Sequence, residues 1–262
     1  MNLFDQDIRL EDQGKSRFAG VVTDNWSVNG TPNGGYLMAM IAGAMLRKSD
    51  KKQTPTVTAN YLSRCVPGEV EIKVSEIARS SQFTRFEARL LQEGQEKIRA
   101  LGTFVSESDG CTVTRYEDNP PELASIAECV RMPALPKYTL FENLDLRLDP
   151  SCAGWLKGEL TDVSLHKGYI EFSSGHPIDL LALFLIIDAM PPAVMSTQGM
   201  TPWVPTIELS VNVRNLPRTD RLKCSLRTRF ITCGLLEADG EVWDEDGNLA
   251  AISRQIAQIR KK

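Results

Sequence analysis

The chain of 262 residues has only two histidines, His166 and His176, and its six cysteines are widely scattered. No Cys-x-x-Cys pair or mixed cysteine–histidine cluster occurs. Because zinc sites are built from closely spaced cysteine and histidine ligands, a zinc site of the usual type is not expected. The cysteines are expected to be free thiols, most of them buried, in a reducing compartment.

The sequence also lacks a basic footprint and an apolar run of membrane length. Its net charge is −4, and the basic end Ile-Arg-Lys-Lys is short, so nucleic acid is not expected as a partner. The longest apolar runs are about a dozen residues, fewer than the ~20 that span a bilayer. The polar, acidic start differs from a secretory signal or a basic transit peptide, and the last residues are not a peroxisomal tripeptide. A cytoplasmic protein without a membrane span is predicted.

What the sequence does contain is a pattern that occurs twice. The apolar stretch NGGYLMAMIAGAML begins at Asn33, and the stretch DLLALFLIIDAM begins at Asp179. Each is apolar around most of the helical circumference, as a helix buried on all sides would be. After each stretch comes a Pro-Thr pair followed by strand-like sequence, at Pro55 and at Pro205, which is 150 residues later.

The strands that follow also repeat. In each copy two strands are predicted around a turn that contains Gly94 or Gly247, with Asp246-Gly247 the stronger hairpin signal. These two glycines are 153 residues apart, so the register of the repeat holds within a few residues. Each copy is therefore one long buried helix followed by several antiparallel strands.

This order of elements predicts an α+β fold, with helices segregated to one face of an antiparallel sheet. A sheet wrapped around a long central helix and duplicated in one chain is the double hotdog arrangement, in which two hotdog domains are fused. The predicted boundaries are 1–108 for the N-terminal hotdog domain, 109–150 for a linker rich in proline and polar residues, and 151–262 for the C-terminal hotdog domain.

One carboxylate, Asp188, lies near the end of the second apolar stretch. If that helix starts near Pro177, Asp179 lies in its first turn, where negative charge is favourable. Asp188 lies close to Pro191 and Pro192, where the helix should end, and faces the negative end of the helix dipole at a cost of about 0.3–1 kcal/mol. The residues alone leave two interpretations open: Asp188 reaches solvent or caps a loop amide, or it has a catalytic role.

Two polar residues on predicted strands are further candidates. Thr206 opens a strand whose alternation places Ile207 and Leu209 on one face and Thr206 on the other. Strand propensity alone favours an ordinary structural threonine there, and Thr56 stands at the equivalent place in the first copy. Gln255 lies in the last strand, with small neighbours on its face that leave space for a ligand.

The offset of 153 residues places Gly102 where the second copy has Gln255. One half thus carries a polar group where the other has none. This predicts one site in the chain and not two.

The sequence resembles the acyl-CoA thioesterase II (TesB-like) family of the thioesterase superfamily, in the version whose two hotdogs are fused. The resemblance covers most of the chain. It rests on PNGGYLMAMIAG in the first half and on DAMPP, WVPTIELSV and EVWDEDGNLAAISRQIAQIR in the second. One departure is Glu208, where the family pattern has an aspartate two residues after the threonine.

The resemblance implies which residues act. In this family an Asp on the second central helix, a Thr at the start of the following strand and a Gln in the last strand hold the hydrolytic water. The equivalent residues are Asp188, Thr206 and Gln255. A carboxylate can accept a proton from water, and a hydroxyl and an amide can orient it. Direct hydrolysis of an acyl-CoA or acyl-carrier thioester is expected, in lipid metabolism, with no acyl-enzyme, metal or cofactor.

The glycines that open the first helix are expected to bind substrate. Helix-start amides have no intrahelical partner, and aimed at a thioester carbonyl those of Gly34 and Gly35 would form an oxyanion hole worth roughly 3–4 kcal/mol per donor in the transition state. The alternative is that the glycines only permit a tight entry into the helix. Asn33 is expected to cap the helix or to contact substrate.

Two other functions remain open. A hydratase or dehydratase of acyl thioesters keeps the fold but usually needs a histidine paired with an acid, and both histidines fall outside the predicted site. A non-hydrolytic acyl-thioester binding protein of a biosynthetic pathway would keep only the pocket. Fused hotdogs already form an internal pseudo-dimer, and further assembly into a homo-oligomer is left open.

Overall fold

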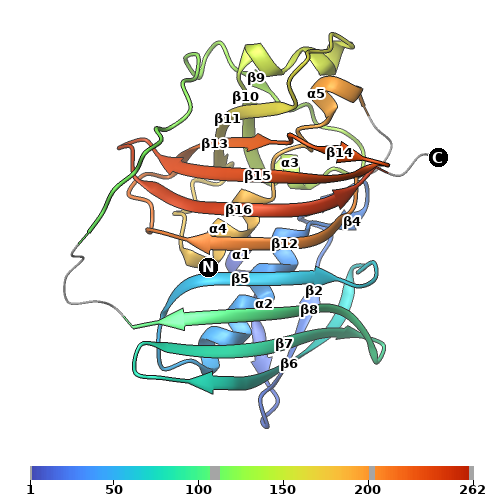
Figure 1. The fold of residues 1–262 in the computed structure, drawn as a ribbon. Helices are drawn as coiled ribbons and strands as arrows, with labels where there is room; N and C mark the ends of the chain where they lie inside the picture. The colour runs from blue at the N-terminus through green and yellow to red at the C-terminus, as the bar shows by residue number, and fades with distance from the viewer. Residues whose placement is uncertain (1, 107–112, 201–203, 260–262) are drawn as a thin grey trace.

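The computed structural model describes residues 2–106, 113–200 and 204–259. One antiparallel sheet of 14 strands runs through both halves of the chain. Figure 1 shows the helices α2 and α4 on one side of this sheet, behind the strands in that view. The structure therefore has the predicted α+β layering.

The first half of the sheet has the order β1 (Leu10–Asp12), β2 (Arg17–Val22), β6 (Gly68–Arg79), β7 (Phe83–Gln92), β8 (Gln95–Val105) and β5 (Gln53–Tyr61). The second half continues with β12 (Thr206–Val213), β16 (Leu249–Gln258), β15 (Leu235–Asp244), β13 (Arg221–Arg227), β11 (Leu165–Phe172), β10 (Leu144–Leu148) and β9 (Val130–Arg131), and β14 (Ile231–Thr232) pairs with β15. The short strands β3 (Ser27–Val28) and β4 (Thr31–Pro32) form a separate pair. The remaining helical segments are α1 (Leu3–Asp7), α3 (Leu140–Asn143), α5 (Met195–Gln198), η1 (Pro150–Cys152) and η2 (Gly154–Lys157).

Strands β5 and β12 join the two halves. They pair antiparallel, with Ala59 opposite Leu209 and Val57 opposite Val211. The sequence offset of 150 makes residues 59 and 209 equivalent, so the pseudo-two-fold axis passes between these two paired residues. The repeat seen in the sequence is thus expressed as one continuous sheet.

The two central helices form where the apolar stretches predict them. Helix α2 (Gly34–Lys48) is rich in Met, Ala and Leu, and the Asn33 side chain caps it by accepting from the amide of Tyr36 at 3.0 Å. Helix α4 (Leu180–Ile187) is only 8 residues long. Asp179 is its N-cap residue and not part of the first turn as predicted, because its side chain accepts from the Ala182 amide at 2.8 Å.

Part of the predicted linker, 109–150, belongs to the second half of the sheet. Strand β10 pairs with β11, and its residues Leu144, Leu146 and Leu148 alternate inward into the core. Residues 109–112 lie outside the described residues. The domain boundaries remain a prediction, but β9, α3 and β10 pack with the second half, because the period-two leucine pattern needs a neighbouring strand and a core to cover it.

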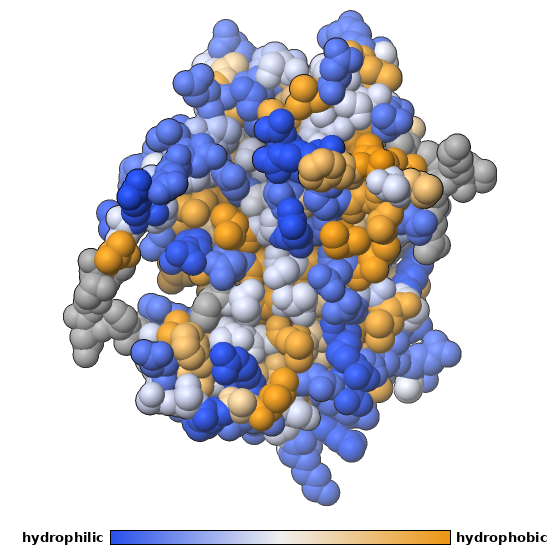
Figure 2. Space-filling view, viewed as in Figure 1, coloured by the Kyte–Doolittle hydropathy of each residue, from blue (hydrophilic) through white to orange (hydrophobic). Residues whose placement is uncertain are grey.

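The sheet has one face toward the helices and one toward solvent. Figure 2 views the outer face, where polar groups are mixed with apolar ones. Among the exposed apolar residues on the strands are Leu101 on β8 and Ile252 on β16. This alternation is usual for an antiparallel sheet with a single buried face. In the described residues, no helix is both long and apolar enough to cross a membrane.

The described cysteines are free thiols, as expected. Four are buried and Cys233 is exposed, while Cys111 lies outside the described residues. The predicted reducing compartment is not tested by this observation.

The N-terminal end of α2 lies in direct contact with the C-terminal end of α4. A Cβ atom at Gly35 would lie 2.1 Å from the carbonyl oxygen of Phe184, which no side chain permits. At the other end of the pair, a Cβ at Gly43 would meet Leu181 Cδ1 at 3.4 Å, an ordinary contact. Only the first of these two helix glycines is required by the packing.

Gly35→Ala should therefore lower the free energy of unfolding by about 3 kcal/mol, since helix backbone must move to relieve the clash. Gly43→Ala is the matched control in the same helix, and it should raise the free energy of unfolding by up to ~1 kcal/mol because alanine favours helix. Urea denaturation of both variants measures this. Equal stability of the two variants would contradict the close approach of the helices.

Candidate active site

Asp188 is the C-cap residue of α4, and its side chain reaches the N-terminal end of α2. Oδ2 of its carboxylate accepts hydrogen bonds from the amide of Gly35 at 2.9 Å and from Nδ2 of Asn33 at 3.1 Å. Nδ2 of Asn33 also donates to the backbone carbonyl of Asp188 at 2.9 Å. A carboxylate that is unfavourable at the end of its own helix is thus placed at the favourable end of another helix.

The other carboxylate oxygen of Asp188 meets the two predicted polar partners. Nε2 of Gln255 donates to Oδ1 of Asp188 at 3.0 Å and to Oγ1 of Thr206 at 2.5 Å. The structure therefore brings Asp188, Thr206 and Gln255 together in one hydrogen-bonded cluster, built from α4, β12 and β16. Their catalytic roles remain a prediction.

A β-bulge places Thr206 in this cluster. The register of β12 shifts between Thr206 and Glu208, so Thr206 lies opposite Ala257 while Leu209 lies opposite Gln255. The extra residue turns Thr206 to the inner face that Leu209 occupies. The alternation predicted for this strand start, with Thr206 and Leu209 on opposite faces, is wrong because the bulge changes the period.

The helix-start residues are in contact with Asp188. The Gly35 amide donates to the carboxylate, so in this arrangement it is not free to serve the predicted oxyanion hole. Asn33 is 8% exposed and both caps α2 and holds Asp188. Binding of substrate by Asn33, Gly34 and Gly35 therefore stays a prediction, whereas their contact with Asp188 is a feature of the structure.

Tyr61 is a member of the site that the sequence did not single out. Its hydroxyl donates to the carbonyl oxygen of Gly34 at 2.8 Å. A Cβ atom at Gly34 would lie 2.9 Å from that hydroxyl and 3.0 Å from Oδ2 of Asp188, so glycine is needed there too. The alternation along β5 could have identified Tyr61 in the sequence. Tyr61 follows the buried Val57 and Ala59 at a spacing of two residues, which places all three on the same face of the strand.

The surroundings of Asp188 set its acidity. Burial raises the pKa of Asp188 to about 6, although hydrogen bonds from Gly35, Asn33 and Gln255 act in the opposite direction. The residue keeps partial exposure to solvent, so water can reach it. Burial and the nearby Asp188 charge raise the pKa of Tyr61 well above its usual value, which keeps the hydroxyl protonated as a donor.

Both histidines have other partners. Nδ1 of His166 lies 3.0 Å from the carbonyl oxygen of Pro191, and burial lowers the pKa of His166 to about 4. Nδ1 of His176 lies 2.5 Å from Nδ2 of Asn2. Within the described part of the chain, neither is a hydrogen-bond partner of Asp188.

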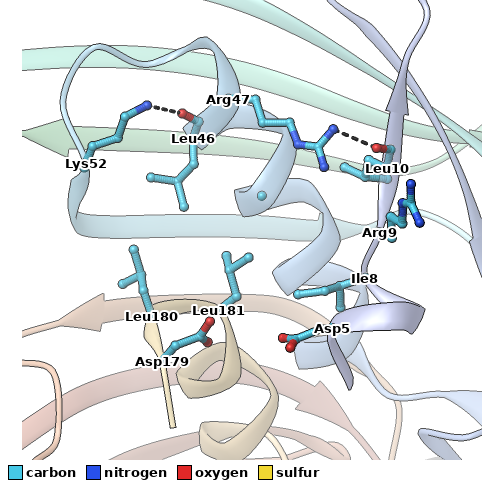
Figure 3. A pocket seen from close by; sticks show the side chains of 11 residues that line it. Asp5, Ile8, Arg9, Leu10, Leu46, Arg47, Lys52, Asp179, Leu180 and Leu181 are labelled. Carbon is cyan, nitrogen blue, oxygen red and sulfur yellow. Dashed lines mark hydrogen bonds between the residues drawn. The ribbon is translucent and has the colours of Figure 1, made fainter. Parts of the chain in front are cut away.

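The pseudo-two-fold axis relates this site to a groove at the opposite end of the helix pair. The groove encloses about 640 Å³ between the C-terminal part of α2 and the start of α4, and Figure 3 shows Leu180 and Leu181 facing Leu46 and Lys52 across it. Asp188 does not line it. Leu180 and Leu181 follow the N-cap of α4, where α2 has two glycines.

The position equivalent to Gln255 is also filled differently. A Cβ atom at Gly102 would lie 2.5 Å from Sδ of Met45, so a core methionine occupies the space that the amide has in the second half. Within the described residues, the carboxylate–amide–hydroxyl cluster therefore exists once, in agreement with the predicted single site.

Two family models match the chain. The family described as "Acyl-CoA thioesterase N-terminal domain" matches residues 22–105, and "Acyl-CoA thioesterase C-terminal domain" matches residues 120–259. No curated protein sequence gives a significant match.

Solved structures show the fold. A candidate thioesterase II from Thermobifida fusca YX is 24% identical, with 100% of this chain and 98% of that chain covered and a TM-score of 0.91. A protein with a hot dog fold from Alicyclobacillus acidocaldarius is 19% identical, with 100% and 99% covered and a TM-score of 0.88. The acyl-CoA thioesterase II TesB2 from Mycobacterium marinum is 16% identical, with 99% and 98% covered and a TM-score of 0.77.

These full-length matches confirm the predicted α+β double hotdog fold. Because the two domain families match in order and together span most of the sequence, the chain belongs to the acyl-CoA thioesterase family.

Proposed function

We propose that this protein hydrolyses acyl-CoA thioesters, releasing a carboxylic acid and free coenzyme A by direct attack of a water molecule that Asp188 activates. The observation that supports this most is the cluster of Asp188, Gln255 and Thr206. It combines a carboxylate of raised pKa with two groups that can orient a water molecule.

The two carboxylate oxygens have different tasks in this proposal. Oδ2 accepts from Gly35 and Asn33, which fix the orientation of the carboxylate. Oδ1 accepts from Gln255 and has a further lone pair for one proton of the water. A base held by three donors keeps one orientation, and little reorganisation is needed when it takes the proton.

Thr206 and Gln255 complete the water site. Oγ1 of Thr206 accepts from Nε2 of Gln255, so the hydroxyl proton of Thr206 can be donated to the water. The two N–H protons of Gln255 hold Asp188 and Thr206 on either side of this water. A water that donates one proton to Asp188 and accepts from Thr206 has one lone pair left, which attacks the thioester carbonyl carbon.

The bond changes balance without a covalent intermediate on the protein. Asp188 takes a proton as the water oxygen bonds to the carbonyl carbon, and the tetrahedral intermediate then collapses with cleavage of the carbon–sulfur bond. The proton on Asp188 passes to the departing thiolate. The products are the carboxylic acid and the free thiol, and Asp188 is again ionised.

Asp188→Asn should lower kcat by about 10²- to 10⁴-fold, because asparagine cannot accept the proton. Asp179→Asn is the matched control, since Asp179 only caps α4 and asparagine caps equally well. Release of coenzyme A from short, medium, long and aromatic acyl-CoAs, followed by chromatography, is the measurement. Unchanged kcat in Asp188→Asn would remove Asp188 from the mechanism, and folded wild-type protein that hydrolyses no member would overturn hydrolysis in favour of binding alone.

The acidic side of the pH profile should report Asp188. The base acts only when ionised, so kcat/KM should fall with a slope of one as the pH drops below about 6, the raised pKa of Asp188. Initial rates with the best substrate between pH 4.5 and 8, in buffers of constant ionic strength, measure this limb. A flat profile across pH 6 would contradict an ionised Asp188 as the base.

The free energy of unfolding should also depend on pH through Asp188, and this test needs no substrate. Between the ordinary pKa of 3.8 and the raised pKa of about 6, the folded state binds a proton that the unfolded state has lost, so stability falls as pH rises through this window. Wild-type protein should lose no more than about 3 kcal/mol relative to Asp188→Asn between pH 4 and 7. Denaturation curves of both proteins at several pH values test this, and parallel pH dependence would contradict it.

A further inference from the structure

The Gly34–Gly35 peptide has a hydrogen bond at each end. Its carbonyl oxygen, on Gly34, accepts from the Tyr61 hydroxyl at 2.8 Å. Its N–H, on Gly35, donates to Oδ2 of Asp188 at 2.9 Å. One planar peptide unit therefore connects a tyrosine on β5 to the carboxylate at the end of α4.

We propose that Tyr61 is a positioning residue that orients and strengthens the hydrogen bond to Asp188 through the Gly34–Gly35 peptide. This inference rests on the proposed hydrolysis for its catalytic meaning. The physical cause is cooperativity: a donor at a peptide carbonyl polarises the amide and makes its N–H a better donor.

We call the hydrogen-bonded chain from Tyr61 through the Gly34–Gly35 peptide to Asp188 the relay. Close contacts hold it at both of its ends. A Cβ atom at Gly34 would lie 2.9 Å from the Tyr61 hydroxyl, and one at Gly35 would lie 2.9 Å from Cβ of Asp188. The tyrosine and the aspartate can approach the peptide this closely only because both of its residues are glycines. Tyr61 also anchors the site to the first half, since β5 belongs to the N-terminal copy while Asp188 belongs to the second.

The groups that face Asp188 come from every element around it. They are Asn33 at the N-cap of α2, Gly35 in its first turn, Tyr61 on β5, Thr206 on β12 and Gln255 on β16. Strand β15 also packs on α4; its Leu236 and Ala238 are apolar and buried, whereas its Asp239 pairs with Arg254 and Arg229.

Two titratable neighbours would not obscure a measured titration of Asp188. The pKa of Tyr61 is raised well above its usual value, so its hydroxyl stays protonated. His166, which contacts the nearby Pro191 carbonyl, has its pKa lowered to about 4 and is neutral above that pH. A titration near pH 6 that is lost in Asp188→Asn is therefore that of Asp188.

The test is a graded series of donors at position 61. Tyr61→Phe removes the donor, and 3-fluorotyrosine at this position provides a stronger donor than tyrosine. The pKa of Asp188 is followed by NMR of ¹³C-labelled aspartate carboxyl groups, with the resonance assigned by its loss in Asp188→Asn. Without the donor the pKa should rise by about 0.2–0.7 unit, and with the stronger donor it should fall below the wild-type value.

Kinetics give the second readout. In Tyr61→Phe the acidic limb of kcat/KM should move upward by the same amount, and kcat should fall several-fold with KM little changed. Tyr169→Phe is the matched control, because the Tyr169 hydroxyl also donates to a backbone carbonyl, that of Ala124 at 3.2 Å, but on β11 away from the site. It should leave the pKa of Asp188 and the rate at wild-type values.

The outcomes separate this inference from the proposed function. An unchanged Asp188 pKa in both position-61 variants would overturn the relay, even if the protein hydrolyses thioesters. An ordered shift across the series would support the relay, even if the wild-type protein hydrolyses none of the acyl-CoAs. If Tyr61→Phe fails to fold, the fluorotyrosine protein alone decides, because a downward shift supports the relay and no shift overturns it.

Discussion

The absence of a side chain at Gly35 is the constraint on which the site depends. The start of α2 lies against the Phe184 carbonyl so closely that a single Cβ atom would occupy the same space. This contact lets the Gly35 amide and the Asn33 side chain reach the carboxylate of Asp188. A longer separation of the two helices would leave the carboxylate partly buried without its donors, which is the arrangement that proteins avoid. The close packing of the two halves is therefore what gives the carboxylate of Asp188 its hydrogen-bond donors.

The same contact explains why an acid can stand at the end of an apolar helix. Considered alone, α4 places Asp188 at its negative end, and burial adds to the cost of ionisation. The positive end of α2 and the amide of Gln255 compensate in part, and the resulting pKa of about 6 lies between that of an exposed aspartate and that of an isolated buried one. Stronger donors would make a weaker base, and fewer donors would leave the carboxyl protonated at neutral pH. The number of hydrogen bonds is thus matched to a base that is ionised yet still able to take a proton.

The sequence predicted the features that depend on local pattern and missed those that depend on long-range contacts. The helices, the repeat and the double hotdog follow from apolar stretches and turn residues whose offset stays within a few residues. The cluster of Asp188, Thr206 and Gln255 was named through a resemblance, and the structure brings these residues together. The bulge that turns Thr206 inward has no local signal, because an extra residue in a strand is defined by its partner strand. The contact of Gly35 with Asp188 and the role of Tyr61 depend on packing between the two copies, which no window of one copy reveals.

The two copies differ by packing as much as by residue identity. Thr56 is equivalent to Thr206, but the register shift of β5 lies before it, between Gln53 and Thr56, and Thr56 donates to the Val211 carbonyl at the seam between the halves. In the second copy the register shift lies after the threonine and turns Thr206 to the helix side. In the first copy Met45 fills the space beside Gly102, and α2 continues as a helix of 15 residues where α4 ends after 8 with an aspartate. A mutation that restored one polar residue in the first copy would still lack the bulge after the threonine and the helix end with its aspartate. The single site is consequently a property of how the duplicated elements pack, and the first copy contributes to it the helix start that holds the base of the second.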